Sequence, residues 1–199
     1  MELLPVMEHF HTVQGEGFHT GRSAYFIRLG GCDVGCVWCD VKESWDIAAH
    51  PKESVEKLTE FVVNSKTKFA VITGGEPAMH DLSNLTERLS SKDIYTAIET
   101  SGCYELKGTV DWYCFSPKKF KAPCDEAYIR ANELKIVINH RSDLEWAEKH
   151  AKRVSSNCLL YLQPEWSNAE RNTELIVSYV KSNPRWKISL QTHKFMNIP

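Results

Sequence analysis

Short apolar runs alternate along this chain with segments in which apolar residues recur every three to four positions. Runs rich in aromatic and β-branched residues predict strands, and the three-to-four spacing predicts amphipathic helices. Strands are predicted at 24–29, 69–73, 94–99, 112–116, 133–138, 158–163 and 187–191. Helices are predicted at 52–64, at 82–89 with Asp81 as the expected cap, at 144–151 and at 175–180.

The alternation of strands with helices predicts parallel βα units in an α/β fold. A closed eight-fold barrel typically needs about 250 residues. This chain has 199 residues, and the crossover at 102–110 is too short for a helix. We therefore expect one domain, residues 1–199, folded as an open, incomplete (partial) βα barrel of the TIM type. Its chemistry should lie at the C-terminal ends of the strands.

Composition narrows the class of protein. A hydrophobic content of 42% and a charged content of 25% are typical of a soluble globular domain. The net charge of −2 gives no sign of a nucleic-acid surface, and no apolar stretch is long enough to span a membrane. The seven cysteines are an odd number, and no secretory leader precedes them. A disulfide framework is therefore not expected. Free thiols indicate instead that the protein is located in a reducing cytoplasm.

Three of the cysteines form the pattern C-x3-C-x2-C at Cys32, Cys36 and Cys39. Three thiolates at this spacing can bind three irons of a 4Fe–4S cluster and leave the fourth iron open to a second molecule. The pattern resembles the loop of the radical S-adenosylmethionine (SAM) superfamily, in which that molecule is SAM. A structural zinc site is the alternative, but it needs four ligands, and the next cysteine, Cys103, stands alone.

Polar motifs follow several of the predicted strands. Gly74-Gly75-Glu76-Pro77 has glycines that expose backbone groups and a carboxylate that can accept from an ammonium group, which suits the methionine part of SAM. By itself it would equally be a βα turn with a helix-starting proline. Ser116-Pro117-Lys118 suits the carboxylate or ribose of SAM, or is a simple turn. Further strand-end residues are 99–102, Lys135 and Gln163-Pro164.

A second group of residues suits a substrate. Gln14 offers a donor and an acceptor and Glu16 two acceptor oxygens, a combination that fits the edge of a pterin or purine; the alternative is a glycine-rich turn. Arg28 lies on a predicted strand, where it can pair with a substrate carboxylate if it faces the interior, but not if it faces solvent. His193 is either a substrate donor or a structural residue.

These stretches together resemble the 7-carboxy-7-deazaguanine synthase family, radical SAM enzymes of the queuosine pathway. The resemblance extends over nearly the whole chain, at 10–17, 28–45, 71–77, 98–102, 115–118, 162–164 and 189–199. Part of that family has a longer gap between its first two cysteines. A glycyl-radical activating enzyme shares the cysteine loop, but 14–17 and the C-terminal stretch argue against it. A non-catalytic metal-binding module is the alternative from another class.

The resemblance implies a specific reaction. The cluster reduces SAM to methionine and a 5′-deoxyadenosyl radical, which takes a hydrogen from 6-carboxy-5,6,7,8-tetrahydropterin. The ring contracts to 7-carboxy-7-deazaguanine with loss of ammonia, and SAM is regenerated. This lyase reaction serves queuosine biosynthesis and hence tRNA modification. The resemblance also implies a homodimer and a flavodoxin-type electron donor, with no nucleic acid or membrane partner.

It also assigns residues. The expected substrate contacts are Val13, Gln14, Gly15, Glu16, Arg28, Thr73, His193 and Pro199, and the expected cofactor contacts are Trp38, Cys39, Asp40, Gly75, Glu76, Ser116, Pro117, Lys118, Gln163 and Pro164. The family commonly continues its loop with Cys-Asp-Thr or Cys-Asp-Ser, and that hydroxyl helps to bind Mg²⁺. Here the run is Cys39-Asp40-Val41, and valine has no side-chain oxygen. Water at reduced affinity is the expected replacement for this Mg²⁺ ligand, so activity should survive with a weaker dependence on Mg²⁺. The alternative is that Asp40 or Ser44 reaches the ion, although Asp40 is equally a turn-forming residue.

Overall fold

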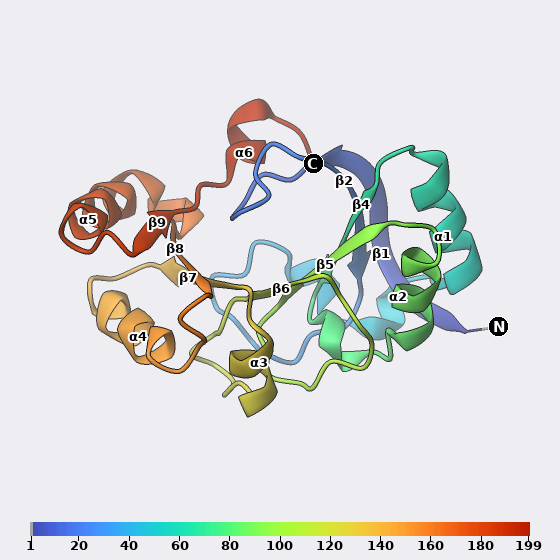
Figure 1. The fold of residues 1–199 in the computed structure, drawn as a ribbon, viewed down its shortest axis with the longest axis horizontal. Coiled ribbons are helices and arrows are strands. Elements are labelled where there is room, and N and C mark those ends of the chain that lie inside the picture. The colour runs from blue at the N-terminus through green and yellow to red at the C-terminus, as the bar shows by residue number, and fades with distance from the viewer. Residues whose placement is uncertain (1) are drawn as a thin grey trace.

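The computed structural model describes residues 2–199, which form a single nine-stranded sheet with most of the helices on its outer face (Figure 1). The order of strands across the sheet is β3-β1-β2-β4-β5-β6-β7-β8-β9. The strands are β1 (Leu3–Val13), β2 (Ser23–Leu29), β3 (Lys52–Ser54), β4 (Phe69–Gly74), β5 (Tyr95–Thr100), β6 (Trp112–Phe115), β7 (Glu133–Ile138), β8 (Leu159–Pro164) and β9 (Trp186–Ile188). The α-helices are α1 (Val55–Asn64), α2 (Ser83–Ser90), α3 (Asp125–Arg130), α4 (Ser142–Ala151), α5 (Ala169–Ser182) and α6 (Thr192–Met196).

The sheet is a partial barrel. Strands β2 and β4 to β9 run parallel to one another, whereas β1 is antiparallel to β2 and β3 is antiparallel to β1. The two edges, β3 and β9, do not pair with each other, so the barrel stays open. The prediction of an incomplete βα barrel is therefore confirmed. No helix within residues 2–199 has the length and apolar character needed to cross a lipid bilayer.

Side-chain alternation along the strands separates two interiors. Successive residues of a strand point to opposite faces. Ile72, Ile98 and Leu134 point outward and are fully buried among the helices, in the large core of the molecule. Their neighbours point into the concave side, where a small apolar cluster forms around Phe69 and Val71. Toward the C-terminal ends of the strands, the concave side carries many polar side chains.

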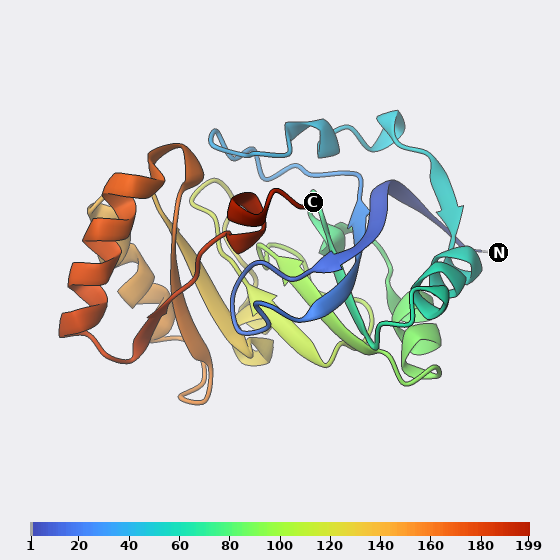
Figure 2. The same cartoon turned by 90° about the horizontal axis from the view of Figure 1, so that it is seen from above.

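The loop at 14–22, between β1 and β2, closes the N-terminal end of the concave side (Figure 2). It inserts His19 against Phe69 and Trp112, with ring centroids 4.8 Å and 4.9 Å apart. Burial lowers the pKa of His19 to about 4, so its ring is neutral at pH 7 and packs as a core residue. The concave side therefore opens only at the C-terminal ends of the strands.

Four elements, β1, β3, α3 and α6, were not predicted, and two of them, β1 and β3, form by pairing between distant segments. The predicted helix at 52–64 begins only at Val55, since Lys52–Ser54 pair with Leu3–Pro5 as β3. Ser54 then caps α1 by accepting a hydrogen bond from the Lys57 N–H (3.2 Å). Strand β1 and helices α3 and α6 carry no strong periodic pattern and were not predicted.

Two predicted boundaries also move. Helix α2 has Leu82 at its N-cap, so the expectation for Asp81 was wrong by one position. Asp81 still accepts from the Ser83 N–H (3.0 Å) and thereby begins the turn. Strand β9 ends at Ile188 rather than at 191, because the following residues leave the sheet and cross toward the cavity.

Glu148 on α4 links that helix to α5 and β9. Its carboxylate accepts from the Tyr179 hydroxyl and the Trp186 ring N–H, both at 2.7 Å, and pairs with Arg185. Burial by itself raises the pKa of Glu148, but these donors lower it overall. We expect Glu148→Ala to reduce the free energy of unfolding by about 2–3 kcal/mol at pH 7, measured by urea denaturation.

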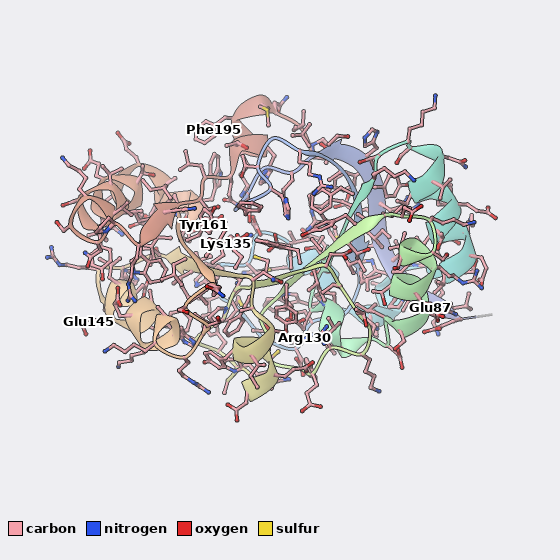
Figure 3. All side chains as sticks on the ribbon, in the orientation of Figure 1. Glu87, Arg130, Lys135, Glu145, Tyr161 and Phe195 are labelled. Atoms are coloured by element: carbon pink, nitrogen blue, oxygen red, sulfur yellow. The ribbon has the colours of Figure 1, made fainter. Side chains whose placement is uncertain are left out.

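The pH dependence tests the cause of this loss. A carboxylate with a lowered pKa stabilises the fold above its ordinary value of 4.5 and loses that contribution as the pH falls through the lowered pKa. The difference between Glu148→Ala and wild type should therefore shrink below pH 4.5. Glu145→Ala is the control, because Glu145 lies on the same helix at the periphery of the molecule and is exposed (Figure 3). An equal loss in both variants would contradict the role of Glu148.

Candidate active site

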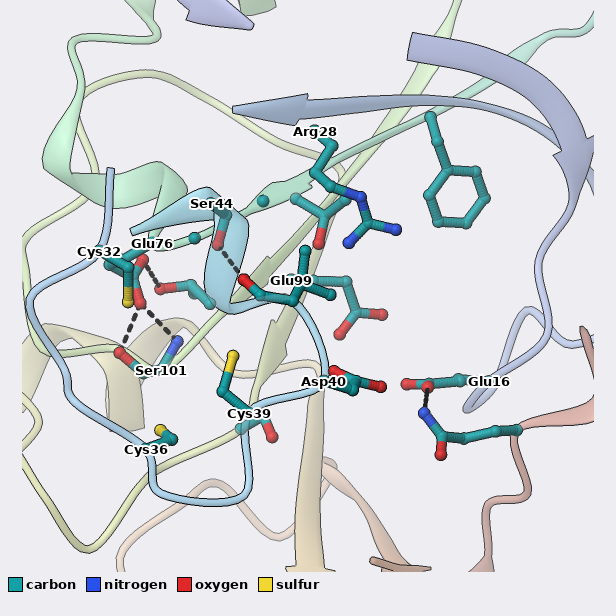
Figure 4. A pocket seen from close by; sticks show the side chains of 18 of the residues that line it. Glu16, Arg28, Cys32, Cys36, Cys39, Asp40, Ser44, Glu76, Glu99 and Ser101 are labelled. Atoms are coloured by element: carbon teal, nitrogen blue, oxygen red, sulfur yellow. Dashed lines mark hydrogen bonds between the residues drawn. The ribbon is translucent and has the colours of Figure 1, made fainter. Parts of the chain in front are cut away.

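A cavity of about 280 Å³ lies inside the barrel at the C-terminal ends of the strands (Figure 4). The cysteine loop, the loop after β1 and the segment after β9 complete its wall. All of the predicted site residues line this cavity except Pro117 and Pro164. Both prolines are buried. The neighbours Ser116 and Gln163 line the cavity, whereas the two prolines do not, and their contact with the cofactor stays a prediction.

The cysteine loop is fixed by backbone hydrogen bonds to the residues that follow it. The Gly31 N–H donates to Ser44 O (2.6 Å), and the Cys32 N–H donates to Trp45 O (3.2 Å). Burial, with Cys39 and Cys32 nearby and against the charge of Lys118, raises the pKa of the Cys36 thiol to about 11. All three cysteines line the cavity, and iron binding must displace the thiol proton.

The three thiols suit a 4Fe–4S cluster, because each cysteine binds a different iron and no fourth protein ligand is needed. A structural zinc site needs four protein ligands. Cys103 does not line the cavity. The described residues therefore offer three thiolates there, which would leave the fourth iron without a protein ligand.

The paired glycines after β4 bring this turn against the cysteine loop. The Gly75 N–H donates to Leu29 O (3.0 Å), and the Glu76 N–H donates to Gly31 O (2.8 Å). A Cβ at Gly75 would collide with the Gly31 carbonyl, and Gly74 has a φ of +141°. The glycines are therefore required for close approach of two backbones. The expectation that their N–H groups are open to a ligand is corrected at Gly75.

Glu76 connects the turn after β4 to the end of β5. It is 1% exposed. One carboxylate oxygen accepts from the Thr100 hydroxyl (2.5 Å) and the Ala78 N–H (3.0 Å), and the other from the Ser101 N–H (2.8 Å) and the Ser101 hydroxyl. A carboxylate offers about four lone-pair positions, and all four are engaged. Glu76 therefore orients the turn, and the expected contact with the ammonium group of SAM is corrected.

Lys118 supplies a cation that has no carboxylate partner within residues 2–199. Its ammonium group donates to the carbonyl and the hydroxyl of Ser116, at 2.8 Å and 2.6 Å. It also lies 5.6 Å from the ring centroid of Trp38. Burial lowers the pKa of Lys118. An unpaired ammonium group in this position attracts a carboxylate, which agrees with the role expected for Ser116 and Lys118.

Lys135 lies at the centre of a charged network on the cavity floor. Its ammonium group donates to Glu16 (2.7 Å) and Glu99 (2.8 Å), and Gln191 donates to the other oxygen of Glu16 (2.9 Å). Burial opposes charge on Glu16, but Lys135 and Gln191 lower its pKa to about 2. The pKa of Lys135 is raised against the effect of burial by the anionic groups around it, including Glu16 and Glu99. Glu16 and Lys135 are therefore both ionised at pH 7.

Arg28 and Thr73 lie side by side, because β2 and β4 pair in a register that places them opposite each other. Arg28 faces the cavity rather than solvent, which is the alternative in which it can pair with a substrate carboxylate. Its Nε donates to a Glu8 carboxylate oxygen (2.6 Å). The two terminal guanidinium nitrogens remain for a ligand, and they form the pair of donors that binds a carboxylate in bidentate fashion.

The C-terminal residues fold over the loop after β1. The Thr192 N–H donates to Gly15 O (3.0 Å), and Pro199 O accepts from the Thr12 hydroxyl (3.2 Å). These contacts place His193 and Pro199 at the cavity beside Val13. The Gln14 side-chain oxygen accepts from the Glu16 N–H (3.0 Å), which leaves its amide donors for a ligand. Burial lowers the pKa of His193.

The segment after Cys39 lines the cavity with Asp40, Val41 and Ser44. Asp40 forms an ion pair with Lys194 of α6 (2.9 Å), which joins the cysteine loop to the C-terminal helix. The Ser44 hydroxyl donates to Val41 O (2.6 Å). Asp40 and Ser44 thus present one free carboxylate oxygen and one hydroxyl acceptor to the cavity region.

Several cavity residues were not assigned a role from the sequence: Phe10, Phe26, Val34, Trp45, Thr100, Ser101, Glu99, Lys135 and Gln191. Phe26 was detectable in principle, because it lies two residues before Arg28 on the same face of β2. Its ring stacks on Phe10 with centroids 5.7 Å apart and forms an apolar wall. Glu99 and Lys135 were marked only by their positions at strand ends.

Comparison with known proteins places this arrangement in a family. Residues 26–111 match the Radical SAM superfamily. The chain is 53% identical to the 7-carboxy-7-deazaguanine synthase of Flavobacterium psychrophilum, over 100% of this chain and 94% of that protein. It is 46% identical to the enzyme of the same name from Synechocystis, over 98% and 93%.

A solved structure agrees with these matches in sequence. The crystal structure of QueE from Escherichia coli superposes with a TM-score of 0.85 at 32% identity, and the match covers 94% of this chain and 93% of that one. The fold, the cysteine loop and the sequence identity over nearly the whole chain therefore support the same family. The chain belongs to the 7-carboxy-7-deazaguanine synthase family of the radical SAM superfamily.

Proposed function

We propose that this enzyme converts 6-carboxy-5,6,7,8-tetrahydropterin to 7-carboxy-7-deazaguanine with release of ammonia, as a radical SAM lyase of queuosine biosynthesis. The observation that carries the proposal is one cavity that joins Cys32, Cys36 and Cys39 to Arg28 and to the loop after β1. A cofactor at the thiols and a small substrate at Arg28 would then be neighbours. The family named for this product supports the choice of substrate.

In this proposal the cysteine side of the cavity binds the cofactors. Cys32, Cys36 and Cys39 would hold a 4Fe–4S cluster, which together with SAM would supply the radical chemistry for hydrogen abstraction. The unpaired ammonium group of Lys118, held by Ser116, binds an anionic or hydroxylated part of SAM. The Gly75 turn, fixed by Glu76, presents its remaining backbone groups on the same side.

The other side of the cavity binds the substrate. The terminal nitrogens of Arg28 pair with its carboxylate, while Glu8 keeps the guanidinium group oriented. The amide donors of Gln14, together with Glu16 and His193, bind the polar edge of the pterin ring. Lys135 positions Glu16 and keeps it ionised, so that it acts as an acceptor.

An anaerobic assay of the reconstituted enzyme with SAM, a reductant and 6-carboxytetrahydropterin tests this function. We expect 7-carboxy-7-deazaguanine to form, with SAM not consumed in proportion to product. SAM cleavage without turnover of the pterin would identify a radical SAM enzyme with another substrate. A protein that binds iron but never cleaves SAM would be a metal-binding module, and the proposal would be wrong.

The proposal includes a flavodoxin-type electron donor, a homodimer and a cytoplasmic location. Val37, between Cys36 and Cys39, is 70% exposed, so a protein donor can approach the cluster closely from outside. The seven cysteines carry free thiols, which is typical of a reducing compartment. Reduction kinetics with flavodoxin and sedimentation of the holoenzyme test the first two parts.

We further propose that Mg²⁺ binds at the substrate with water in place of the missing hydroxyl. Val41 lines the cavity but has no side-chain oxygen, and Asp40 is already paired with Lys194. Mg²⁺ requires octahedral oxygen ligands and readily keeps waters, so activity should survive with a weak Mg²⁺ dependence. Val41→Thr should increase the stimulation by Mg²⁺ in steady-state assays.

Val37→Thr is the matched control, because it places the same hydroxyl outside the cavity. It should leave the Mg²⁺ response unchanged. If chelation abolishes wild-type activity, micromolar Mg²⁺ restores it, and Val41→Thr changes nothing, then another protein oxygen binds the ion.

A further inference from the structure

A second hollow lies on the outside of the barrel, between the loop that follows β7 and the helix α5. Its lining residues are Asn139, His140, Arg141, Arg171, Asn172 and Leu175. None of them lines the active-site cavity. Helices α4 and α5 flank the hollow and lie next to each other in both ribbon views (Figures 1 and 2). The chemistry assigned to the enzyme uses none of these residues.

The two arginines of the hollow have no carboxylate partner within residues 2–199, since no carboxylate of this range lies within 4.0 Å of Arg141 or Arg171. Arg171 makes one long hydrogen bond, to Asn139 O (3.3 Å). Two unpaired guanidinium groups from different elements therefore border the same hollow.

The acceptor groups of Asp143 and Asn139 already accept hydrogen bonds from other residues. The Asp143 carboxylate accepts from the N–H groups of Asn139 and His140, both at 2.8 Å, and pairs with Lys119. The Asn139 side-chain oxygen accepts from Asn168 (3.3 Å). The six residues that line the hollow include two arginines and no carboxylate, so the lining itself carries positive charge that is open to a ligand.

Asn172 gives an independent indication. This residue lines the hollow and is only 1% exposed, yet its side-chain amide nitrogen has no hydrogen-bond partner. An unpaired donor inside a protein costs free energy, which an entering acceptor would recover. The asparagine and the arginines therefore favour the same kind of ligand, one that carries several acceptor oxygens and negative charge.

We propose that this hollow binds the phosphate group of a small molecule. A phosphate has three or four acceptor oxygens in a tetrahedral arrangement, so it can accept from two guanidinium groups and an amide that approach from different sides. A carboxylate has two oxygens in one plane and would satisfy fewer of these donors. The site is distinct from the substrate cavity and adds an anion-binding function to the enzyme.

Titration of the holoenzyme with inorganic phosphate, followed by calorimetry at constant ionic strength with chloride as reference, tests the proposal. We expect saturable binding that Arg141→Gln and Arg171→Gln each weaken by at least about tenfold, and that Asn172→Ala also weakens. Lys149→Gln on α4 and Lys181→Gln on α5 are exposed controls outside the hollow and should bind as wild type does.

Adenosine 5′-monophosphate in a parallel titration identifies the source of the phosphate. Tighter binding than inorganic phosphate would indicate a phosphate ester, and equal binding would indicate the free ion; both support the site. The absence of binding beyond the chloride reference would overturn the proposal. Unchanged affinity in the double variant Arg141→Gln/Arg171→Gln, with its fold verified by circular dichroism, would also overturn it. The measurement does not involve turnover, so it is independent of the proposed reaction.

Discussion

Replacement of Cys32, Cys36 or Cys39 by alanine should abolish the iron–sulfur absorbance and all cleavage of SAM. Each thiolate binds one corner of the cluster. Among residues 2–199, no other cysteine lines the cavity and can replace a lost ligand. Iron and sulfide content, the visible spectrum and formation of 5′-deoxyadenosine should fall together, to background in each variant.

Cys103→Ala is the matched control. Cys103 lies near the same region of the fold, but its sulfur contacts the Ser101 hydroxyl (3.0 Å) rather than the cavity. This variant should keep its cluster and cleave SAM. An alanine variant at one of the three loop cysteines that retains a full cluster and wild-type SAM cleavage would contradict the assignment. Loss of the cluster in Cys103→Ala alone would contradict it as well.

Lys135→Met should cause the largest loss of stability of any single change in the cavity. Lys135 is 4% exposed on its side chain and pairs with both Glu16 and Glu99. Without the ammonium group, two carboxylates remain close together in a partly buried place with no compensating charge. Removal of one partner from such a network typically costs about 3–5 kcal/mol. Chemical denaturation at pH 7 should show this loss, and turnover should fall at least tenfold because Glu16 is no longer positioned.

The pH profile distinguishes this electrostatic cause from poor packing. In wild type the pKa of Glu16 is lowered to about 2, so its contribution to stability is lost only as the pH falls from about 4.5 toward that value. In Lys135→Met the pKa of Glu16 should rise, because its cationic partner is gone, and protonation of Glu16 should relieve the repulsion. The difference in stability between variant and wild type should therefore narrow between pH 7 and pH 4.

Two further variants complete the test. Lys187→Met changes an exposed lysine of β9 and should leave stability almost unchanged. Glu99→Gln in the Lys135→Met background should recover part of the lost stability, because it removes one of the two facing charges. A pH-independent loss in Lys135→Met, with no recovery in the double variant, would show that packing rather than charge explains the effect.

Local patterns in the sequence determined most of the barrel. The run at 69–73 became β4 almost residue for residue, because a strand buried on both faces is apolar at nearly every position. The run at 133–138 became β7, in which Glu133 and Lys135 interrupt the apolar pattern. The amphipathic repeats became α1, α2, α4 and α5. The chain length excluded a closed barrel. The cysteine spacing indicated the cofactor, since three ligands on one short loop need no tertiary partner.

Tertiary structure decided how the residues at the strand ends act. Glu76 and Glu16 both look like free acceptors in the sequence, but each is engaged by donors distant in the chain. Ser101 reaches Glu76 across 25 positions, and Lys135 reaches Glu16 across 119. Charge pairing of this kind leaves no periodic signal, because it depends on which strands become neighbours in the sheet.

The same reason explains the elements that were not predicted. Strand β1 contains a proline and several polar residues, and it exists because β2 and β3 supply hydrogen-bond partners on its two sides. Helix α6 has only five residues and is held by Gly15 and Asp40. The sequence by itself thus determined the fold class, the cluster loop and the set of polar residues at the strand ends. Only the tertiary structure decided which of those residues pair with one another and which remain free for a ligand, because burial and charge pairing are properties of distant segments brought together.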